Sequence, residues 1–268
     1  MESDSLRVAA WQAAPGPLDV DGNLARLDAV AASAAARGAQ VLVTPELFLT
    51  GYAIGHEDVR RLAVPADALP FLGPRGIAAR HRVALVAGFP ELAGDGPDAA
   101  VHNAAAVVAP DGALVAVHRK VHLWGSLDQA QFSANPLPPA GYELLGHRLG
   151  SLICYDVEFP EAVRRLAVQG AAVVLVPTAN PLGCDEVQDV LLRARAVESG
   201  VGIVYANYAG SDTQLTYNGT SMVIAPDGTV LARASRDEEE LLVADLPLGP
   251  DASRTGAGYL RDRRPGLY

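Results

Sequence analysis

Three residues of chemically active types each follow an apolar run that reads as a strand. Cys154 comes directly after the run 149–153, Glu46 follows 41–43, and Lys120 follows 114–117. A cysteine between a buried strand and a helix start is placed to act as a nucleophile. A desolvated carboxylate can shuttle protons near neutral pH, and a fixed ammonium can stabilise a thiolate or an oxyanion. Together the three side chains predict nucleophilic attack by sulfur on a carbonyl carbon.

Each of these residues also has an ordinary structural interpretation when it is taken alone. Cys154 could be a small core residue, Glu46 a helix-capping acid, and Lys120 a surface lysine beside Arg119. The local pattern gives no Cys–His pair, but His118 and His122 flank the lysine, and a pairing of His122 with Cys154 stays open. The choice therefore depends on whether the fold brings the three strand ends together.

Composition narrows the class of protein. The 268-residue chain has a net charge of -10 and 50% hydrophobic residues, which fits a single domain with a large core. An acidic chain without a basic cluster is a poor partner for nucleic acids or anionic membranes. No apolar run approaches the ~20 residues of a membrane span, and the N-terminus does not resemble a signal peptide. Two cysteines, Cys154 and Cys184, make no disulfide framework and favour the cytoplasm.

Cofactor signals are weak. His56, Glu57 and Asp58 are adjacent in the chain and not at metal-ligand spacing, so we expect no metal site. There is also no glycine-rich phosphate or dinucleotide motif after a strand. The chemistry proposed for the three residues requires neither a metal nor an organic cofactor.

Periodicity and turn signals predict alternating strands and helices. The expected strands are 6–12, 41–43, 83–88, 104–108, 114–117, 149–153, 173–176, 202–206, 219–225, 230–234 and 241–245. The expected helices are 23–37, 69–81, 160–169 and 187–199, whereas 123–142 and the Gly-, Pro- and Arg-rich tail from about 248 are expected to be irregular.

An internal repeat organises these elements. The stretch 38–45, GAQVLVTP, resembles 170–178, GAAVVLVPT, and VVAPDG at 107–112 resembles VIAPDG at 223–228. Each half then reads strand, helix, buried strand, helix, buried strand, hairpin. Two such halves favour two sheets packed face to face with helices outside, which is a four-layer α-β-β-α sandwich. Its matching strand ends would place Glu46 and Cys154 at the same edge.

Three spaced motifs resemble the nitrilase superfamily of carbon–nitrogen hydrolases. They are PELFLTGY around Glu46, HRKVHLWG around Lys120 and ICYDVEFPE around Cys154, and the resemblance extends from Val8 to about Asp245. The motif CYDVEFPE and the tail segment GYLR are most similar to the sequences of bacterial aliphatic amidases. The resemblance implies one carbon–nitrogen hydrolase domain over 1–268, with the α-β-β-α fold and dimerisation through outer helices.

The resemblance also implies roles for individual residues. It assigns Cys154 as nucleophile, Glu46 as general base, Lys120 as the cation that holds the tetrahedral intermediate, and the backbone N–H of Tyr155 as a second oxyanion donor. The family often has another glutamate in the loop after the lysine, and this chain has Asp128 there, one methylene shorter. Asp128 could help to position the substrate amide, or it could be a plain loop acid.

Other residues are candidates for the rim and lining of the site. Tyr52, Phe48 and Asn103 could line the pocket or simply pack at strand edges, Asn180 could contact substrate, and Glu158 could belong to the acidic network or orient the lysine. Cys184 is interpreted as a bystander.

The leading hypothesis is an amidase that converts a small carboxamide to a carboxylic acid and ammonia through a cysteine thioester. A nitrilase or an N-carbamoyl amino acid amidohydrolase with the same three residues is the alternative within enzymes. A non-catalytic interaction protein on the same scaffold is disfavoured, because Glu46, Lys120 and Cys154 occur together.

Overall fold

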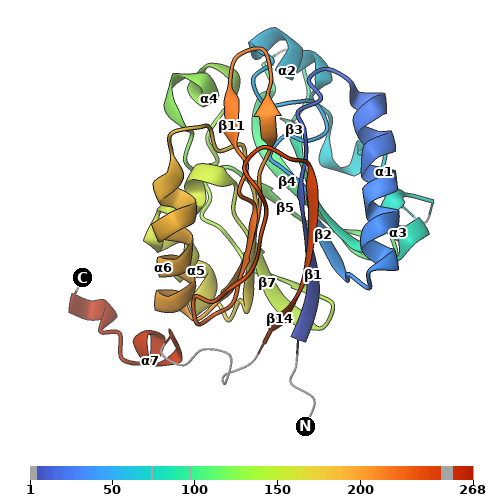
Figure 1. Ribbon diagram of the computed structural model, residues 1–268. Helices are drawn as coiled ribbons and strands as arrows, with labels where there is room; N and C mark the ends of the chain where they lie inside the picture. The colour runs from blue at the N-terminus through green and yellow to red at the C-terminus, as the bar shows by residue number, and fades with distance from the viewer. Residues whose placement is uncertain (1–4, 74, 97, 249–255, 268) are drawn as a thin grey trace.

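Two six-stranded sheets dominate the computed structural model, which describes residues 5–73, 75–96, 98–248 and 256–267 (Figure 1). The first sheet has the order β14-β1-β2-β3-β4-β5, and the second has the order β13-β12-β9-β8-β7-β6. The strands of the first sheet are β1 (Ser5–Gln12), β2 (Val41–Val43), β3 (Ala84–Ala93), β4 (Ala100–Val108), β5 (Leu114–Arg119) and β14 (Glu240–Pro247). Those of the second are β6 (Tyr142–Leu144), β7 (His147–Ser151), β8 (Val173–Pro177), β9 (Gly202–Ala206), β12 (Met222–Ile224) and β13 (Val230–Arg233).

Helices cover the outer face of each sheet. The helices α1 (Val20–Ala36) and α3 (Ile77–His81) lie on the first sheet, and α5 (Pro160–Val168) and α6 (Leu192–Ser199) lie on the second. Figure 1 shows α2 (His56–Leu62), α4 (Gly125–Gln131) and the small hairpin of β10 (Ala209–Ser211) and β11 (Thr216–Asn218) together at one end of the sandwich. The helix α7 (Gly256–Arg261) lies near the C-terminus.

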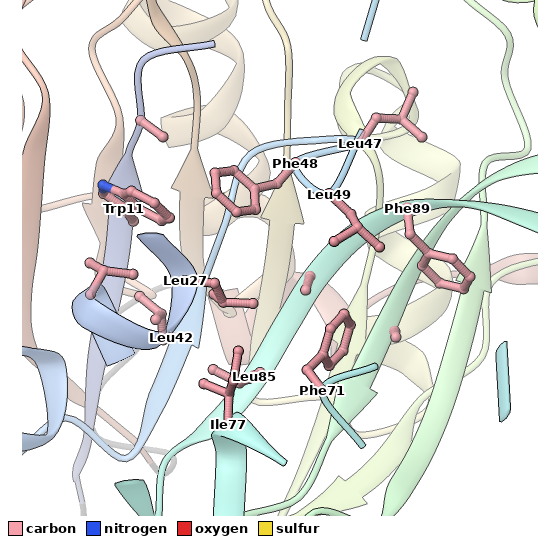
Figure 2. Close-up of a cluster of buried hydrophobic side chains, with 14 of the residues drawn as sticks. Trp11, Leu27, Leu42, Leu47, Phe48, Leu49, Phe71, Ile77, Leu85 and Phe89 are labelled. Atoms are coloured by element: carbon pink, nitrogen blue, oxygen red, sulfur yellow. The ribbon is translucent and has the colours of Figure 1, made fainter. Parts of the chain in front are cut away.

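Strand alternation explains the four layers. In β1, Val8 and Ala10 pack between the sheets, whereas Ala9 and Trp11 face the α1 layer. The same alternation holds in β2 and β8, so these continuously apolar strands are buried on both faces. Figure 2 shows the outer cluster of the first sheet, where Leu27 of α1 packs beside Trp11 and Phe48. The predicted α-β-β-α sandwich is confirmed.

The two halves repeat the same strand pattern. In the first half, three parallel strands are followed by two antiparallel ones, in the order β1, β2, β3, β4 and β5. The second half repeats this arrangement with β7, β8, β9, β12 and β13. Even the register irregularity recurs, between Val107 and Val108 in one half and between Val223 and Ile224 in the other. The repeated APDG turns that follow these positions are therefore the sequence trace of a structural duplication.

One strand crosses the boundary between the halves. The last strand, β14, follows the second half in the chain but pairs antiparallel with β1 of the first sheet, from Ser5↔Pro247 to Gln12↔Glu240. It completes the first sheet as its outermost strand beside β1, while β6 holds the corresponding place beside β7.

Several predicted segments differ from the structure in their bounds. The helix expected over 69–81 is wrong in its first half, because among the described residues of that segment only Ile77–His81 is helical. Pro70 and Gly73 interrupt the earlier residues, and a Cβ at Gly76 would lie 2.1 Å from the Phe71 carbonyl oxygen. The strand expected over 149–153 is shifted, since β7 ends at Ser151.

Further elements were not expected, among them α2 and β6. The segment 123–142, predicted to be a loop, contains the helix α4, which begins after Trp124. The tail from about 248 was expected to be irregular, but α7 lies within it; residues 249–255 are outside the described part of the chain. The hairpin β10–β11 was missed, because its three-residue strands carry almost no periodic signal.

Candidate active site

Glu46 is held at the end of β2 by a tightly wound turn. Leu47 adopts a left-handed backbone with φ of 50°, and the Leu49 N–H donates to the Gly88 carbonyl at 3.1 Å. A Cβ at Gly88 would lie 2.2 Å from the Leu47 nitrogen, so only glycine allows β3 to approach the turn this closely. The Glu46 N–H donates to the carbonyl of Thr178 at 3.2 Å, and Thr178 follows β8 of the other sheet. This bond ties the two sheet edges together.

Lys120 lies one residue beyond β5, with its side chain completely buried. Its N–H donates to the carbonyl of Asn103 in β4 at 2.8 Å, and its own carbonyl accepts from the Asn135 N–H at 3.0 Å. These main-chain bonds extend the β4–β5 pairing past the strand end. They fix the direction in which the long lysine side chain leaves the sheet.

Cys154 opens a single 3-10 turn, Cys154–Glu158, directly before α5. Its φ of 48° is in the left-handed region that a non-glycine residue rarely adopts. Such conformations persist only where surrounding structure enforces them, and they cluster at functional sites. The side chain is only 6% exposed, with the thiol near Thr178 and the backbone of Ala179.

The three residues meet in one buried cluster together with Asp128. Lys120 Nζ lies 2.7 Å from Glu46 Oε1 and 2.6 Å from Asp128 Oδ2, and none of these side chains is exposed. Asn103 Nδ2 donates to the same Glu46 oxygen at 2.6 Å. The other oxygen, Glu46 Oε2, is buried and has no hydrogen-bond partner within the described ranges. Oε1 of the glutamate is therefore fixed by hydrogen bonds, and Oε2 is available to accept a proton.

Electrostatics make the cluster suitable for proton transfer. Burial raises the pKa of Glu46, and the nearby charge of Asp128 adds to this effect against the attraction of Lys120. Burial alone would lower the pKa of Lys120, but Glu46, Cys154 and Asp128 hold it well above its usual value. Burial and the charge of Glu46 raise the pKa of the Cys154 thiol, although Lys120 partly offsets them. Burial therefore favours the protonated thiol, which needs a base to become a nucleophile.

Asp128, the residue that stands where the family often has a second glutamate, forms an ion pair with Lys120. Its Oδ2 accepts from Lys120 and from the Trp124 N–H at 2.9 Å, and its Oδ1 accepts from the Tyr52 hydroxyl at 2.8 Å. Both oxygens are thus occupied by protein donors. The bond to Trp124 links this carboxylate to the residue directly before α4, which is the helix that brings it to the cluster.

The other candidate residues divide between the cluster and its surroundings. Tyr52 and Asn103 contact it directly through Asp128 and Glu46, whereas Phe48 points into the hydrophobic core beside Trp11, with ring centroids 4.7 Å apart (Figure 2).

Asn180 donates its side-chain amide to the Cys184 carbonyl at 3.1 Å and to Gln188 at 3.0 Å, so it braces the loop before α6. Glu158 is half-buried at the end of the cysteine turn, and burial together with Glu186 raises its pKa to about 7. The Tyr155 N–H belongs to the same turn, and its ring packs edge-on against Phe159.

The histidines beside the lysine do not pair with the cysteine. His118 Nε2 lies 3.0 Å from Asp156 Oδ2, and His122 Nδ1 lies 2.8 Å from Asp156 Oδ1. Sequence reasoning assigned no role to Asp156, which stands two residues after the cysteine. Its place in the motif between Cys154 and Glu158 was the only available signal.

A cation, a carboxylate with one unpaired oxygen and a buried thiol define a class of enzyme, the thiol-dependent hydrolases that act through an acyl intermediate. Among the residues that the structure describes, no cluster of His, Cys, Asp and Glu side chains could hold a metal ion. In the same part of the chain no helix is long and apolar enough to cross a membrane.

Comparison with known proteins identifies the family. The carbon-nitrogen hydrolase family model matches residues 7–250. A Pseudomonas protegens protein described as a hydrolase in the pqqF 5' region is 44% identical, over 98% of this chain and 91% of that protein. An (R)-stereoselective amidase from a Pseudomonas species is 34% identical, with 97% and 92% covered.

A solved structure extends the comparison. It is a mutant amidase from Nesterenkonia sp. AN1 with the acetamide moiety of fluoroacetamide added covalently to the active-site cysteine. That protein is 37% identical and aligns with a TM-score of 0.83 over 100% of this chain and 97% of its own. The chain belongs to the carbon–nitrogen hydrolase family, and it is an enzyme of the amidase type.

Proposed function

We propose that the enzyme hydrolyses a small carboxamide to the carboxylic acid and ammonia, with Cys154 as nucleophile and Glu46 as general base. In the first step, Glu46 Oε2 takes the thiol proton as sulfur attacks the amide carbon. The resulting oxyanion is stabilised by the Lys120 ammonium and by the backbone N–H of Tyr155. Glu46 then passes its proton to the amide nitrogen, which leaves as ammonia and gives a thioester on Cys154.

The second half of the reaction reuses the same groups. Once ammonia has left, Glu46 Oε2 accepts a proton from water, and the hydroxide attacks the thioester carbon. The second oxyanion meets the same donors, and the Cys154 thiolate leaves and recovers its proton from Glu46. Every atom that enters as water leaves in the carboxylic acid and in the reprotonated thiol.

One observation carries the proposal: the two oxygens of Glu46 have different environments. Oε1 is held by Lys120 and Asn103, while Oε2 is buried and has no partner among the residues that the structure describes. Leaving a buried carboxylate oxygen unpaired costs ~1–3 kcal/mol or more of stability. Such a cost is tolerated where the reaction needs a free acceptor. Burial also raises the pKa of Glu46, which makes this carboxylate a better acceptor for the thiol proton.

Asp128 has a supporting part in this scheme. Its two oxygens are taken by Lys120, Trp124 and Tyr52, which favours a role in orienting the lysine over direct contact with the substrate amide. A rigid lysine suits an oxyanion donor, because a donor placed before the reaction costs no reorganisation during it.

The decisive experiment is ammonia release from a panel of short aliphatic amides, nitriles and N-carbamoyl amino acids, with the Cys154→Ala variant as control. We expect the amides to be the best substrates, with no turnover by the variant. Mass spectrometry after treatment with fluoroacetamide should find the adduct on Cys154. Turnover by Cys154→Ala at the wild-type rate would end the proposal, and nitriles as the best substrates would favour the nitrilase alternative.

We also propose that the enzyme is a cytoplasmic homodimer joined through its outer helices. Apolar side chains face outward on this side of the molecule: Val168 of α5, Val190 before α6 and Tyr259 of α7 are each more than half exposed. Both cysteines are free thiols, which suits a reducing compartment. Sedimentation equilibrium of the wild type and of Val168→Asp tests the dimer, since a buried charge should weaken the association.

A further inference from the structure

The carboxylate of Asp156 joins the segment that carries Lys120 to the segment that carries Cys154. It is completely buried. On the lysine side it accepts hydrogen bonds from the backbone N–H groups of Val121, at 3.2 Å, and His122, at 2.9 Å. On the cysteine side it accepts from the N–H of Ile153 at 3.3 Å. The bound backbone groups are therefore direct neighbours of both Lys120 and Cys154.

Two histidine rings complete the environment of this carboxylate. His118 of β5 approaches Oδ2 at 3.0 Å, and the ring of His122 approaches Oδ1 at 2.8 Å. Burial alone would raise the pKa of Asp156, but the hydrogen bonds from His118 and His122 hold it well below its usual value. The hydrogen-bond donors around Asp156 therefore favour its ionised form.

The second histidine is itself fixed on the cysteine side. The ring of His122 stacks on Phe159, with centroids 3.8 Å apart and planes within 10°, and Tyr155 packs edge-on against the same phenylalanine. Phe159 immediately follows the 3-10 turn that Cys154 begins. The lysine segment and the cysteine turn are thus connected twice, by the carboxylate and by this aromatic stack.

We propose that Asp156 is a positioning residue that sets the placement of the Lys120 ammonium relative to the Cys154 sulfur. This inference rests on the proposed function, because it specifies how two of the catalytic groups are aligned. No main-chain ladder pairs β5 directly with β7, since the two strands belong to different sheets. The alignment of Lys120 with Cys154 across the two sheets therefore needs a connection other than strand pairing. The buried carboxylate of Asp156 supplies it, because its oxygens accept hydrogen bonds from both segments. A misplacement of about 1 Å can cost ~10²-fold in rate.

The direct test is Asp156→Asn, which keeps the size of the side chain but removes the charge and one acceptor. We expect kcat to fall by about 10²-fold while KM changes little, since the substrate contacts are retained. A second readout needs no substrate: the rate of Cys154 alkylation by iodoacetamide as a function of pH. The titratable groups near the thiol are Glu46, Lys120, Tyr52 and Tyr205. Of these, Lys120 lowers the thiol pKa, so a displaced ammonium should move the alkylation profile to higher pH.

A pair of variants at His118 keeps the proposal testable if Asp156→Asn does not fold. His118→Gln places an amide donor near the position of Nε2, and His118→Met has a similar length without a donor. We expect His118→Gln to retain most of the wild-type kcat and alkylation profile, and His118→Met to change both in the direction of Asp156→Asn. Asp245→Asn is the matched control, because it makes the same chemical change in an exposed ion pair with Arg7.

A purely structural role for Asp156 predicts a different pattern. In that case thermal stability falls, but kcat and the alkylation profile of the folded variants stay at the wild-type values, well below their melting temperatures. This outcome would overturn the inference. Failure of the proposed amidase activity is distinguishable from it, because the wild type would then release no ammonia while the alkylation profiles would still report on the alignment.

Discussion

Replacing Asp128 with asparagine should shift the pH dependence of the reaction in a defined direction. Two carboxylates, Glu46 and Asp128, share the single ammonium of Lys120, and the charge of Asp128 raises the pKa of Glu46. Removing that charge should stabilise the ionised form of Glu46. Because the base must be ionised to act, the acidic limb of the kcat/KM profile should move to lower pH.

The expected size of this shift follows from the geometry. Glu46 Oε1 and Asp128 Oδ2 lie 2.7 Å and 2.6 Å from the same nitrogen, so the two oxygens are at most about 5.3 Å apart. Two unit charges at that separation interact by ~3 kcal/mol at an effective dielectric constant of ~20. This energy corresponds to a displacement of the limb by about two pH units, at ~1.4 kcal/mol for each.

The assay is kcat/KM for the best amide between pH 4 and about 9, with ammonia release as the signal. Asparagine can present its oxygen to Lys120 and Trp124 and its amide to the Tyr52 oxygen, so we expect the variant to fold. Tyr52→Phe is the matched control, because it removes a hydrogen bond to Asp128 but leaves both charges in place. A limb that does not move in Asp128→Asn, or that moves to higher pH, would refute the electrostatic reasoning.

Two further predictions concern the lysine and the glutamate turn. Lys120→Met leaves two buried carboxylates without their cation. We expect kcat, measured by ammonia release, to fall at least 10²–10³-fold, and the free energy of unfolding, measured by urea denaturation, to drop by ~3–5 kcal/mol. Retention of a tenth of the wild-type activity would contradict the role of Lys120 as an oxyanion donor. Gly88→Ala places a Cβ 2.2 Å from the Leu47 nitrogen, so it should displace Glu46 and lower the rate of ammonia release. Gly266→Ala is the control, because its Cβ meets nothing within 4 Å, and it should be as active as the wild type. Equal activity of the two variants would argue against the dependence of Glu46 placement on Gly88.

The layers of the fold were predictable because their signals are local. Short, continuously apolar runs such as 41–43 and 173–176 read as strands buried on both faces, and the repeated APDG turns mark hairpins in both halves. Once the duplication is recognised, the sandwich and the meeting of Glu46 with the cysteine edge follow from topology. The three motifs that resemble the family belong to those strand ends, and the family assignment is confirmed.

The parts that were missed depend on contacts between distant segments. The helix α4 has no clear apolar stripe, and its residue Asp128 is held by Lys120, Tyr52 and the Trp124 N–H. No window of sequence around Asp128 contains Tyr52, so neither the helix nor the function of its carboxylate could be read locally. The same holds for Asp156, whose partners come from β5 and from the residues after it.

The pairing of β14 with β1 has a consequence for the order of assembly during synthesis. The first strand of the chain waits for a neighbour more than 200 residues away, and until then its edge can pair with any other exposed strand. Contacts of such long range close late and slow folding. On the ribosome, this edge of the first sheet therefore remains open until residues 240–247 have emerged. In this interval the free edge of β1 is open to misassembly.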